Sequence, residues 1–249
     1  MRRSERLEKR LPLWAAALSA LLLGLVEIPA QRTVFGIDVS YYQGPNIDWE
    51  QVCADGKTFA FVRASGGTSY EDPYYIQNMT SGRAAGLHMG SYHYPWISSD
   101  PSTAITEVEH FISVAGPFLT PDYMRPVLDV ESGYELGREA LSAWVETWLT
   151  EFESRMGFEP LIYTNTWYAT NFIEPELNRY DLWFARYNGD PQSDPPSGIW
   201  EDFFFLQYSN TGSVAGISGA VDLDVFTGTL GELQARFLIP AGNSGLTLR

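Results

Sequence analysis

The sequence predicts an α/β protein, namely an irregular β/α barrel of about eight strands with an incomplete outer ring of helices. Short apolar strands alternate with amphipathic helices from residue 31 onward, which is typical of β/α units in a mostly parallel sheet. About eight such strands in roughly 210 residues fit one closed barrel better than two small domains. Hydrophobic residues make up 45% of the chain and aromatic residues 14%, which excludes intrinsic disorder as its main character.

The expected strands are short apolar runs bounded by polar or turn-forming residues. In chain order they cover residues 34–39, 59–64, 88–94, 126–130, 161–164, 182–185, 203–207 and 220–223. The expected helices begin near residue 47 and then cover 73–85, about 101–115, about 136–156 and about 230–237, with glycines marking several of their ends. The segment 188–197 is too rich in proline and glycine for a crossover helix, so we expect gaps in the outer ring.

The first thirty residues have the pattern of an export signal. Met1–Arg10 contains five basic and two acidic side chains, and Leu11–Val26 follows without a charge. A retained membrane anchor is the main alternative, although sixteen residues are fewer than the roughly 20 that a spanning helix needs. A buried core helix is a third interpretation. We therefore expect an exported protein, extracellular or periplasmic, with a signal or anchor over 1–30, a barrel over 31–240 and a tail over 241–249.

Charge and composition exclude several classes of function. The formal net charge is −15 and the pI is about 4.5, which argues against a nucleic-acid partner. The single cysteine, Cys53, excludes an intramolecular disulfide framework, and three histidines leave little for a multi-histidine metal site. We predict no metal, no cofactor and a monomeric protein whose chemistry depends on carboxylates and aromatic side chains.

Four carboxylates stand near the ends of predicted strands: Asp38, Asp129, Glu131 and Asp222. In a parallel barrel these ends share one face, and that face carries the active site. The alternative is that each acid only caps the loop or helix that follows it. That explanation is adequate for one acid but poor for four, because like charges brought together cost folding free energy.

Asp129 and Glu131 form the most informative pair. Residues i and i+2 of a strand point to the same face, with backbones roughly 6.6–6.8 Å apart, while Val130 faces the opposite way. Two carboxyls so placed can share the work of glycoside cleavage, one as proton donor and one as ionised partner. Because glutamate reaches further, we assign Glu131 as the general acid and Asp129 as the ionised partner.

Aromatic residues at or just past the strand ends offer flat faces for sugar rings. These are Tyr41, Tyr42, Tyr92, Tyr94, Trp96, Tyr163, Trp167, Trp183, Tyr187 and Tyr208. For Tyr92 and Tyr163 we favour a place in the site over core packing. Trp144 and Trp148 are expected in the core instead, and His93 is expected to be a hydrogen-bonded structural histidine.

Several short motifs follow one another along the chain: Asp38-Val39-Ser40 with Gln43-Gly44, Ile47-Asp48-Trp49, Gly90-Ser91-Tyr92-His93-Tyr94, Leu128-Asp129-Val130-Glu131, Ile162-Tyr163-Thr164, Leu206-Gln207-Tyr208 and Val221-Asp222. In this order they resemble the glycoside hydrolase family 25 lysozymes of the N,O-diacetylmuramidase type. The resemblance spans about Val34 to Gly228. It implies a flattened barrel that hydrolyses the β-1,4 bond from N-acetylmuramic acid to N-acetylglucosamine in peptidoglycan glycan strands. It also implies that Glu131 is the proton donor and that Asp38, Asp129 and Asp222 line the cleft.

The predicted site therefore has Glu131 and Asp129 as catalytic residues, with Asp38, Tyr92, Tyr163, Gln207 and Asp222 as substrate-binding residues. One position departs from the family, which usually has Asp-x-Asn near the last strand where this chain has Asp222-Leu223-Asp224. Asp224 cannot donate an amide hydrogen, so we expect a supporting contact to be rearranged. Two other functions stay open, a non-catalytic wall-binding protein and a barrel glycosidase acting on chitin-like polymers.

Overall fold

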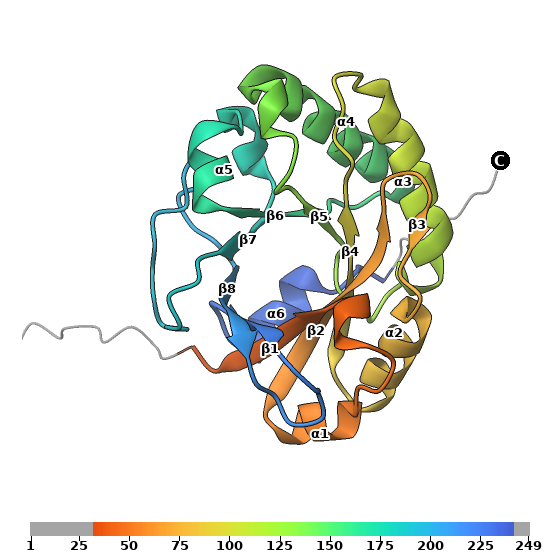
Figure 1. Cartoon of the computed structure of the whole chain (residues 1–249), viewed down its shortest axis with the longest axis vertical. Helices are drawn as coiled ribbons and strands as arrows, with labels where there is room; N and C mark the ends of the chain where they lie inside the picture. The colour runs from red at the N-terminus through yellow and green to blue at the C-terminus, as the bar shows by residue number, and fades with distance from the viewer. Residues whose placement is uncertain (1–31, 242–249) are drawn as a thin grey trace, which may run out of the picture. The chain divides into compact units, whose positions relative to one another are not determined.

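The computed structural model describes residues 32–241, which form a closed β-barrel with helices around it (Figure 1). The barrel strands are β1 (Val34–Val39), β2 (Lys57–Gly66), β4 (His88–Tyr94), β5 (Val127–Asp129), β6 (Leu161–Asn165), β7 (Leu182–Ala185), β8 (Phe205–Gly212) and β9 (Val221–Phe226). The sheet order is β1-β9-β8-β7-β6-β5-β4-β2-β3, and pairing of β1 with β2 closes it. A two-residue strand, β3 (Tyr70–Glu71), pairs with the end of β2. The predicted barrel of about eight strands is confirmed.

Strand direction corrects one part of the prediction. Seven barrel strands are parallel, whereas β9 runs antiparallel to both β1 and β8. Asp222, expected near the end of the last strand, lies instead at the start of β9. Because β9 runs in reverse, its start reaches the same barrel face as the ends of the parallel strands. Asp222 thus lies on the expected face for a different reason.

Helices cover the barrel unevenly. They are α1 (Trp49–Ala54), α2 (Tyr75–Ala84), α3 (Ser102–Ala115), α4 (Arg138–Met156), α5 (Thr166–Asn171) and α6 (Leu230–Phe237), with short 3-10 turns at Tyr41–Gln43, Gly116–Phe118, Tyr134–Leu136 and Pro175–Arg179. Residues 186–204, all described, connect β7 to β8 without a helix. The outer ring is therefore incomplete, as predicted from the proline- and glycine-rich segment.

Local sequence signals fix several helix ends. The Asp48 side chain accepts a hydrogen bond from the backbone N–H of Gln51 at 3.1 Å and caps α1. Thr229 and Glu232 form a capping box at the start of α6. Gly157 ends α4 in the left-handed conformation, with φ of 75°. These ends were predictable because capping depends on residues adjacent in sequence.

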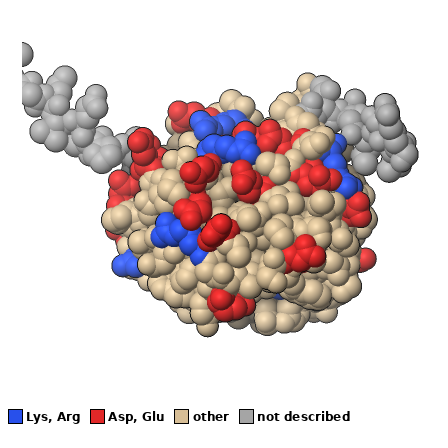
Figure 2. Space-filling view, turned by 90° about the horizontal axis from the view of Figure 1, so that it is seen from above, with Lys and Arg blue, Asp and Glu red and all other residues tan. Residues whose placement is uncertain are grey.

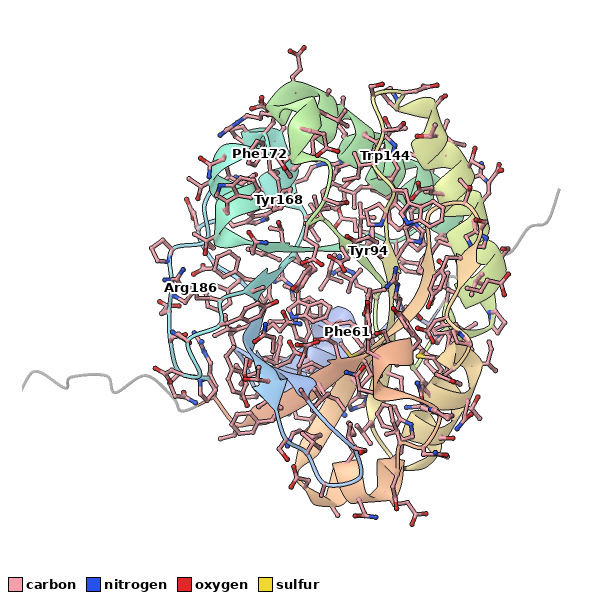
Figure 3. All side chains as sticks on the ribbon, viewed as in Figure 1. Phe61, Tyr94, Trp144, Tyr168, Phe172 and Arg186 are labelled. Carbon is pink, nitrogen blue, oxygen red and sulfur yellow. The ribbon has the colours of Figure 1, made fainter. Side chains whose placement is uncertain are left out.

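The larger core lies between the outer faces of the strands and the helices. Trp144, which is labelled in Figure 3, and Trp148 of α4 are fully buried there, as predicted. His93 is also buried on this face, where its ring nitrogens lie 2.9 Å from Ser65 Oγ and 2.9 Å from Glu107 Oε2. Burial lowers the pKa of His93, which keeps the ring neutral. The prediction of a structural histidine is confirmed.

The smaller core fills the barrel itself. Inward-facing aromatic side chains pack at the end of the barrel opposite the carboxyl ends of the parallel strands, where Leu233 and Phe237 of α6 join them. The aromatic residues are Phe59, Phe61, Trp183, Phe205 and Phe226. The inner face becomes polar only toward the carboxyl ends of the parallel strands. A barrel plugged at one end in this way can hold a site only at the other.

In the part of the chain that the structure describes, no helix combines the length and apolar character that crossing a membrane requires. The predicted signal or anchor over residues 1–30 lies outside the described residues. The same holds for the predicted tail, except for its first residue.

Candidate active site

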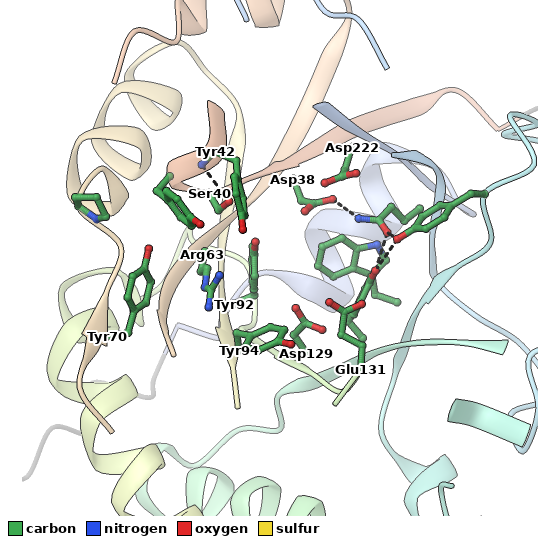
Figure 4. Close-up of a pocket in the computed structure, with 16 residues that line it drawn as sticks. Asp38, Ser40, Tyr42, Arg63, Tyr70, Tyr92, Tyr94, Asp129, Glu131 and Asp222 are labelled. Atoms are coloured by element: carbon green, nitrogen blue, oxygen red, sulfur yellow. Dashed lines mark hydrogen bonds between the residues drawn. The ribbon is translucent and has the colours of Figure 1, made fainter. Parts of the chain in front are cut away.

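A pocket of about 830 Å³ opens at the carboxyl ends of the parallel strands (Figure 4). All seven predicted site residues line it: Asp38, Tyr92, Asp129, Glu131, Tyr163, Gln207 and Asp222. They come from six strands, β1, β4, β5, β6, β8 and β9, and from the residues just after β5. The barrel thus brings together side chains that are up to 184 positions apart in the sequence.

The backbone after β5 holds Asp129 and Glu131 on one face. The Val130 N–H donates to the Tyr163 carbonyl at 2.8 Å, and the Thr164 hydroxyl donates to the Val130 carbonyl at 2.7 Å. These contacts keep the segment extended, so Val130 packs into the outer core while its two neighbours line the pocket. The predicted same-face arrangement is confirmed.

The two carboxyls differ in their surroundings. Asp129 is 7% exposed, and burial raises its pKa well above the usual range, assisted by the charge of Glu131 and opposed by Arg63. Glu131 lies on the exposed wall, where partial burial and the Asp222 charge raise its pKa and Arg63 again opposes the shift. The pair therefore competes for a proton, and in this structure deeper burial favours Asp129 as its holder.

A chain of hydrogen bonds fixes the opposite wall. Gln207 Nε2 donates to Asp38 Oδ2 at 2.6 Å, while Gln207 Oε1 accepts from the hydroxyls of Tyr163 at 2.7 Å and Tyr187 at 2.8 Å. Gln207 is buried, and its carbonyl oxygen is occupied by protein donors. Its main effect on the site is therefore to orient Asp38.

Asp38 and Asp222 lie opposite each other across the β1–β9 pairing. Burial raises the pKa of Asp222 to about 6. Burial also raises the pKa of Asp38 well above its usual range, and the charges of Asp224 and Asp222 raise it further. Since four carboxyls face one pocket, the site retains protons at pH values where exposed carboxyls have lost theirs.

Seven of the ten predicted aromatic residues line the pocket: Tyr41, Tyr42, Tyr92, Tyr94, Tyr163, Trp183 and Tyr187. The placement of the other three in this pocket was wrong. Tyr208 follows the inward-facing Gln207 and so points outward, where it packs on the outer core. Trp96 and Trp167 lie beyond the strand ends and are 52% and 50% exposed.

Arg63 is the main residue of the pocket that sequence reasoning missed, and Ser40, Tyr70 and Pro73 were missed too. The Arg63 guanidinium carbon lies 4.8 Å from the ring centres of both Tyr70 and Tyr94, and Nε is buried without a hydrogen-bond partner. Its positive charge opposes the raised pKa values of Asp129 and Glu131. A signal existed, since an arginine inside the apolar run Phe59–Ala64 needs a reason to be there.

No group of three or more His, Cys, Asp or Glu side chains within residues 32–241 is arranged to hold a metal ion.

Known proteins resemble the chain in both sequence and fold. Residues 37–217 match the family described as glycosyl hydrolases family 25. YegX of Escherichia coli K12 is 36% identical over 216 residues, which cover 84% of this chain and 75% of YegX. Lysozyme M1 of Streptomyces globisporus is 32% identical over 230 residues, covering 85% of this chain and 76% of that protein. The crystal structure of the bacterial lysozyme from Streptomyces coelicolor matches with a TM-score of 0.71 at 28% identity, covering 81% of this chain and 95% of that one.

Proposed function

The chain belongs to glycosyl hydrolases family 25 and is a glycoside hydrolase of the lysozyme type, and we propose that it cleaves peptidoglycan glycan strands with retention of configuration. The bond is the β-1,4 linkage from N-acetylmuramic acid to N-acetylglucosamine. The observation that carries the proposal is the convergence of Asp129 and Glu131 on one pocket with raised pKa values. Such a pair can supply both a proton and a negative charge at one sugar linkage.

Glu131 is the general acid in this proposal. Its side chain lies on the exposed wall, where the oxygen of a bound glycan can reach it. A sugar ring over Glu131 removes water from the carboxyl, which raises its pKa further and draws the shared proton from Asp129. Glu131 then protonates the leaving oxygen as positive charge develops on the sugar.

Asp129 stabilises that positive charge in one of two ways. It either attacks the anomeric carbon directly or orients the 2-acetamido group of the substrate to attack. Both routes proceed through an intermediate that water opens, so both retain configuration. The other polar residues of the pocket, Asp38 and Asp222, bind the sugar, Tyr92 and Tyr163 contact its faces, and Gln207 holds Asp38 in place.

The test of this function is mass analysis of soluble fragments after incubation with purified peptidoglycan. We expect fragments whose new reducing end is N-acetylmuramic acid. Fragments ending in N-acetylglucosamine contradict the assigned bond. Tight binding to walls without fragments indicates a non-catalytic wall-binding protein, and faster release from chitin oligomers than from walls indicates a chitin-directed glycosidase.

The place of action follows from the substrate. Peptidoglycan lies outside the cytoplasmic membrane, so the proposal requires residues 1–30 to act as a cleaved export signal or as a membrane anchor through residues 11–26. Residues 31–240 then form the hydrolase domain, followed by a tail. Amino-terminal sequencing of the protein from culture medium and from membranes distinguishes the two outcomes.

Surface charge predicts how the rate depends on salt. Residues 1–30 hold five basic and three acidic residues, so the rest of the chain carries a formal charge near −17. Acidic side chains are spread over the face shown in Figure 2. Anionic wall polymers repel such a surface, and this repulsion is screened over about 10 Å at 0.1 M salt.

We therefore expect the initial rate of wall lysis to rise several-fold between about 10 mM and 100 mM salt, as repulsion is screened. The measurement is loss of turbidity of a wall suspension, with uncharged glycan oligomers as the control substrate. A flat or falling profile on walls contradicts the prediction.

A further inference from the structure

Asp224 is a buried carboxyl that the proposed mechanism does not use. It lies on the inner face of β9, in register with Gln207 of β8 and Gly36 of β1, and it is 0% exposed. Trp183 Nε1 donates to Asp224 Oδ1 at 2.8 Å. No donor within the described residues reaches Asp224 Oδ2. An ionised carboxylate with one oxygen buried and unpaired is costly, so this group needs another explanation.

The neighbour of Asp224 is the carboxyl of Asp38, and the contact between the two raises the pKa of Asp38 and lowers that of Asp224. A carboxylate only accepts hydrogen bonds, so a hydrogen bond between two carboxyls requires a proton on one of them. The Asp38 Oδ2 atom already receives a hydrogen bond from Gln207 at 2.6 Å, which stabilises a negative charge on Asp38. Asp224 is the more deeply buried of the two and is the one whose Oδ2 lacks a donor.

We propose that Asp224 is a neutral, protonated carboxyl group that donates a hydrogen bond from Oδ2 to the Asp38 carboxylate and thereby positions Asp38 in the pocket. A protonated carboxyl has nearly the shape of an asparagine side chain, and each can accept at one atom and donate at the other. Asp224 therefore performs the donation expected of the asparagine that the resembled family usually has here. The expectation of a rearranged contact was based on an ionised Asp224.

The surroundings of Asp224 contain no positive charge that could stabilise its ionised form. The titratable groups facing it are Asp38 from β1 and Asp222 from its own strand, and Tyr208 of β8, which points to the outer core, is affected only by the charge of Asp224. The other polar contact, Trp183 from β7, is neutral. Burial raises the pKa of Asp224 well above its usual range and the charge of Asp222 adds to this, while the contacts with Trp183 and Asp38 oppose the shift without cancelling it.

This arrangement makes the stability of the folded protein fall as pH rises, which an asparagine at this position would not do. The folded protein holds a proton on Asp224 that the unfolded chain releases above about pH 4. The stability from this site is present below the unfolded pKa and is lost as pH rises through the folded pKa. When Asp224 ionises, Asp38 loses its donor and faces a second negative charge.

The test compares wild type with Asp224→Asn and, as the matched control, Asp38→Asn. Thermal midpoints are measured from pH 4 to pH 8, together with the pH profile of kcat/KM for glycan cleavage. We expect Asp224→Asn to have the flatter stability curve, so that its midpoint gains several degrees on wild type as pH rises. The ratio of its kcat/KM to that of wild type should also rise several-fold over this range.

Two results overturn the proposal. The first is a midpoint difference between Asp224→Asn and wild type that does not change with pH. The second is a greater flattening of the curve in Asp38→Asn than in Asp224→Asn, which places the proton on Asp38. The catalytic role rests on the proposed function, but the thermal measurement needs no substrate, so a failed activity assay and a misplaced proton give different results.

A second, independent observation concerns a smaller cavity beside the active site. This cavity of about 400 Å³ is lined by Asn165, Thr166, Trp167, Ala185, Arg186, Tyr187 and Asn188. Tyr187 lines both cavities, so the two lie next to each other. Trp167 and Tyr187 are each 50% exposed and offer apolar faces.

Arg186 is unusual among the basic residues of this acidic chain (Figure 3). Within residues 32–241, the other Lys and Arg side chains make ion pairs or hydrogen bonds, except Arg63 inside the catalytic pocket. The exposed side chain of Arg186 makes neither in the described part of the chain. An unpaired guanidinium beside an aromatic wall is suited to an incoming carboxylate.

We infer that this second cavity receives the peptide attached to muramic acid, with Arg186 pairing to a carboxylate of that peptide. The inference rests on the proposed function, because only a peptidoglycan strand carries such a peptide next to the bond that is cleaved. A chitin-like strand has no carboxylate for Arg186 to bind. The cavity therefore favours peptide-bearing strands over bare ones.

The test is the selectivity of Arg186→Gln. Rates of cleavage are compared on peptide-bearing glycan strands and on the same strands freed of peptide by an amidase. We expect the ratio of the two kcat/KM values to fall about tenfold or more, the usual worth of one charge-assisted hydrogen bond. Arg179→Gln, which removes an exposed arginine paired with Glu153, is the matched control and should leave the ratio unchanged.

An unchanged ratio in Arg186→Gln overturns this inference. So does an equal loss on both substrates, because the amidase exposes the lactyl carboxylate of muramic acid, and an equal loss indicates that Arg186 pairs with that group or acts structurally. If the wild type cleaves neither substrate, the proposed function fails. That outcome is distinct from an unchanged ratio and from an equal loss in Arg186→Gln, since both of these require an active wild type.

Discussion

Glu131→Gln is expected to reduce glycan cleavage by about 10³-fold, because the amide cannot protonate the leaving oxygen. The fold should be unaffected, since the side chain lies on the exposed wall of the pocket and glutamine has the same shape. Removing one of four neighbouring carboxyls also relieves repulsion, so the thermal midpoint should stay equal or rise. The measurements are release of reducing ends from peptidoglycan and thermal unfolding at one pH.

Glu135→Gln is the matched control, because Glu135 is exposed in the 3-10 turn four residues later and does not line the pocket. It should cleave at the wild-type rate. A Glu131→Gln enzyme that keeps a tenth or more of its activity contradicts the assignment. Loss of activity together with a lowered thermal midpoint indicates misfolding, and the same unfolding curves detect it.

The parts of the site that the sequence predicted are those that depend on local geometry. Asp129 and Glu131 share a face because they are two residues apart, and any extended backbone gives that result. His93 could likewise be separated from Tyr92, because neighbours on a strand face opposite ways. Apolar runs and glycine ends located most strands and helices, since these signals also lie within a few residues of each other.

The parts that were missed depend on contacts between distant segments. Gln207 and Asp38 are 169 positions apart, and their hydrogen bond exists only because β8, β9 and β1 are neighbours in the closed barrel. The reversal of β9 could not be predicted from its apolar pattern, because that pattern is the same in either direction. The contact of Arg63 with Tyr70 could not be predicted either, because Tyr70 belongs to a two-residue strand too short to detect.

The charge of Asp224 is a further example of what sequence alone leaves open. Its identity was noted as a departure from the family, but its protonation depends on burial and on Asp38, which lies 186 positions earlier. An aspartate and an asparagine differ in charge only where the environment allows the aspartate to ionise. Here the folded barrel, and not the residue type, determines which chemistry the position presents.

Asp129→Asn is expected to lower glycan cleavage by about 10²- to 10³-fold, because the positive charge on the sugar loses its nearest negative partner. Most substitutions of buried residues destabilise the fold, but this one should stabilise it at neutral pH. Burial raises the pKa of Asp129 in the folded protein, so this carboxyl contributes stability below about pH 4 that is lost as pH rises through its folded pKa. Asparagine removes that loss.

The thermal midpoint of Asp129→Asn should therefore exceed that of wild type at pH 7 and approach it at pH 4. The exposed Asp202→Asn serves as the control and should show no such difference. A midpoint below wild type at pH 7 contradicts the raised pKa of Asp129, because an ionised, well-solvated carboxylate would not be improved by neutralisation.

The same position separates the two routes that retain configuration. Asp129→Ala leaves space beside the anomeric carbon, and added azide can occupy it. If Asp129 is the nucleophile, azide should restore cleavage and yield a glycosyl azide of inverted configuration. If Asp129 orients the acetamido group, azide should restore nothing, because the attacking oxygen belongs to the substrate. Asp129 Oδ1 is buried and has no hydrogen-bond donor within the described residues, so no protein contact assigns either role to it, and the rescue experiment distinguishes them.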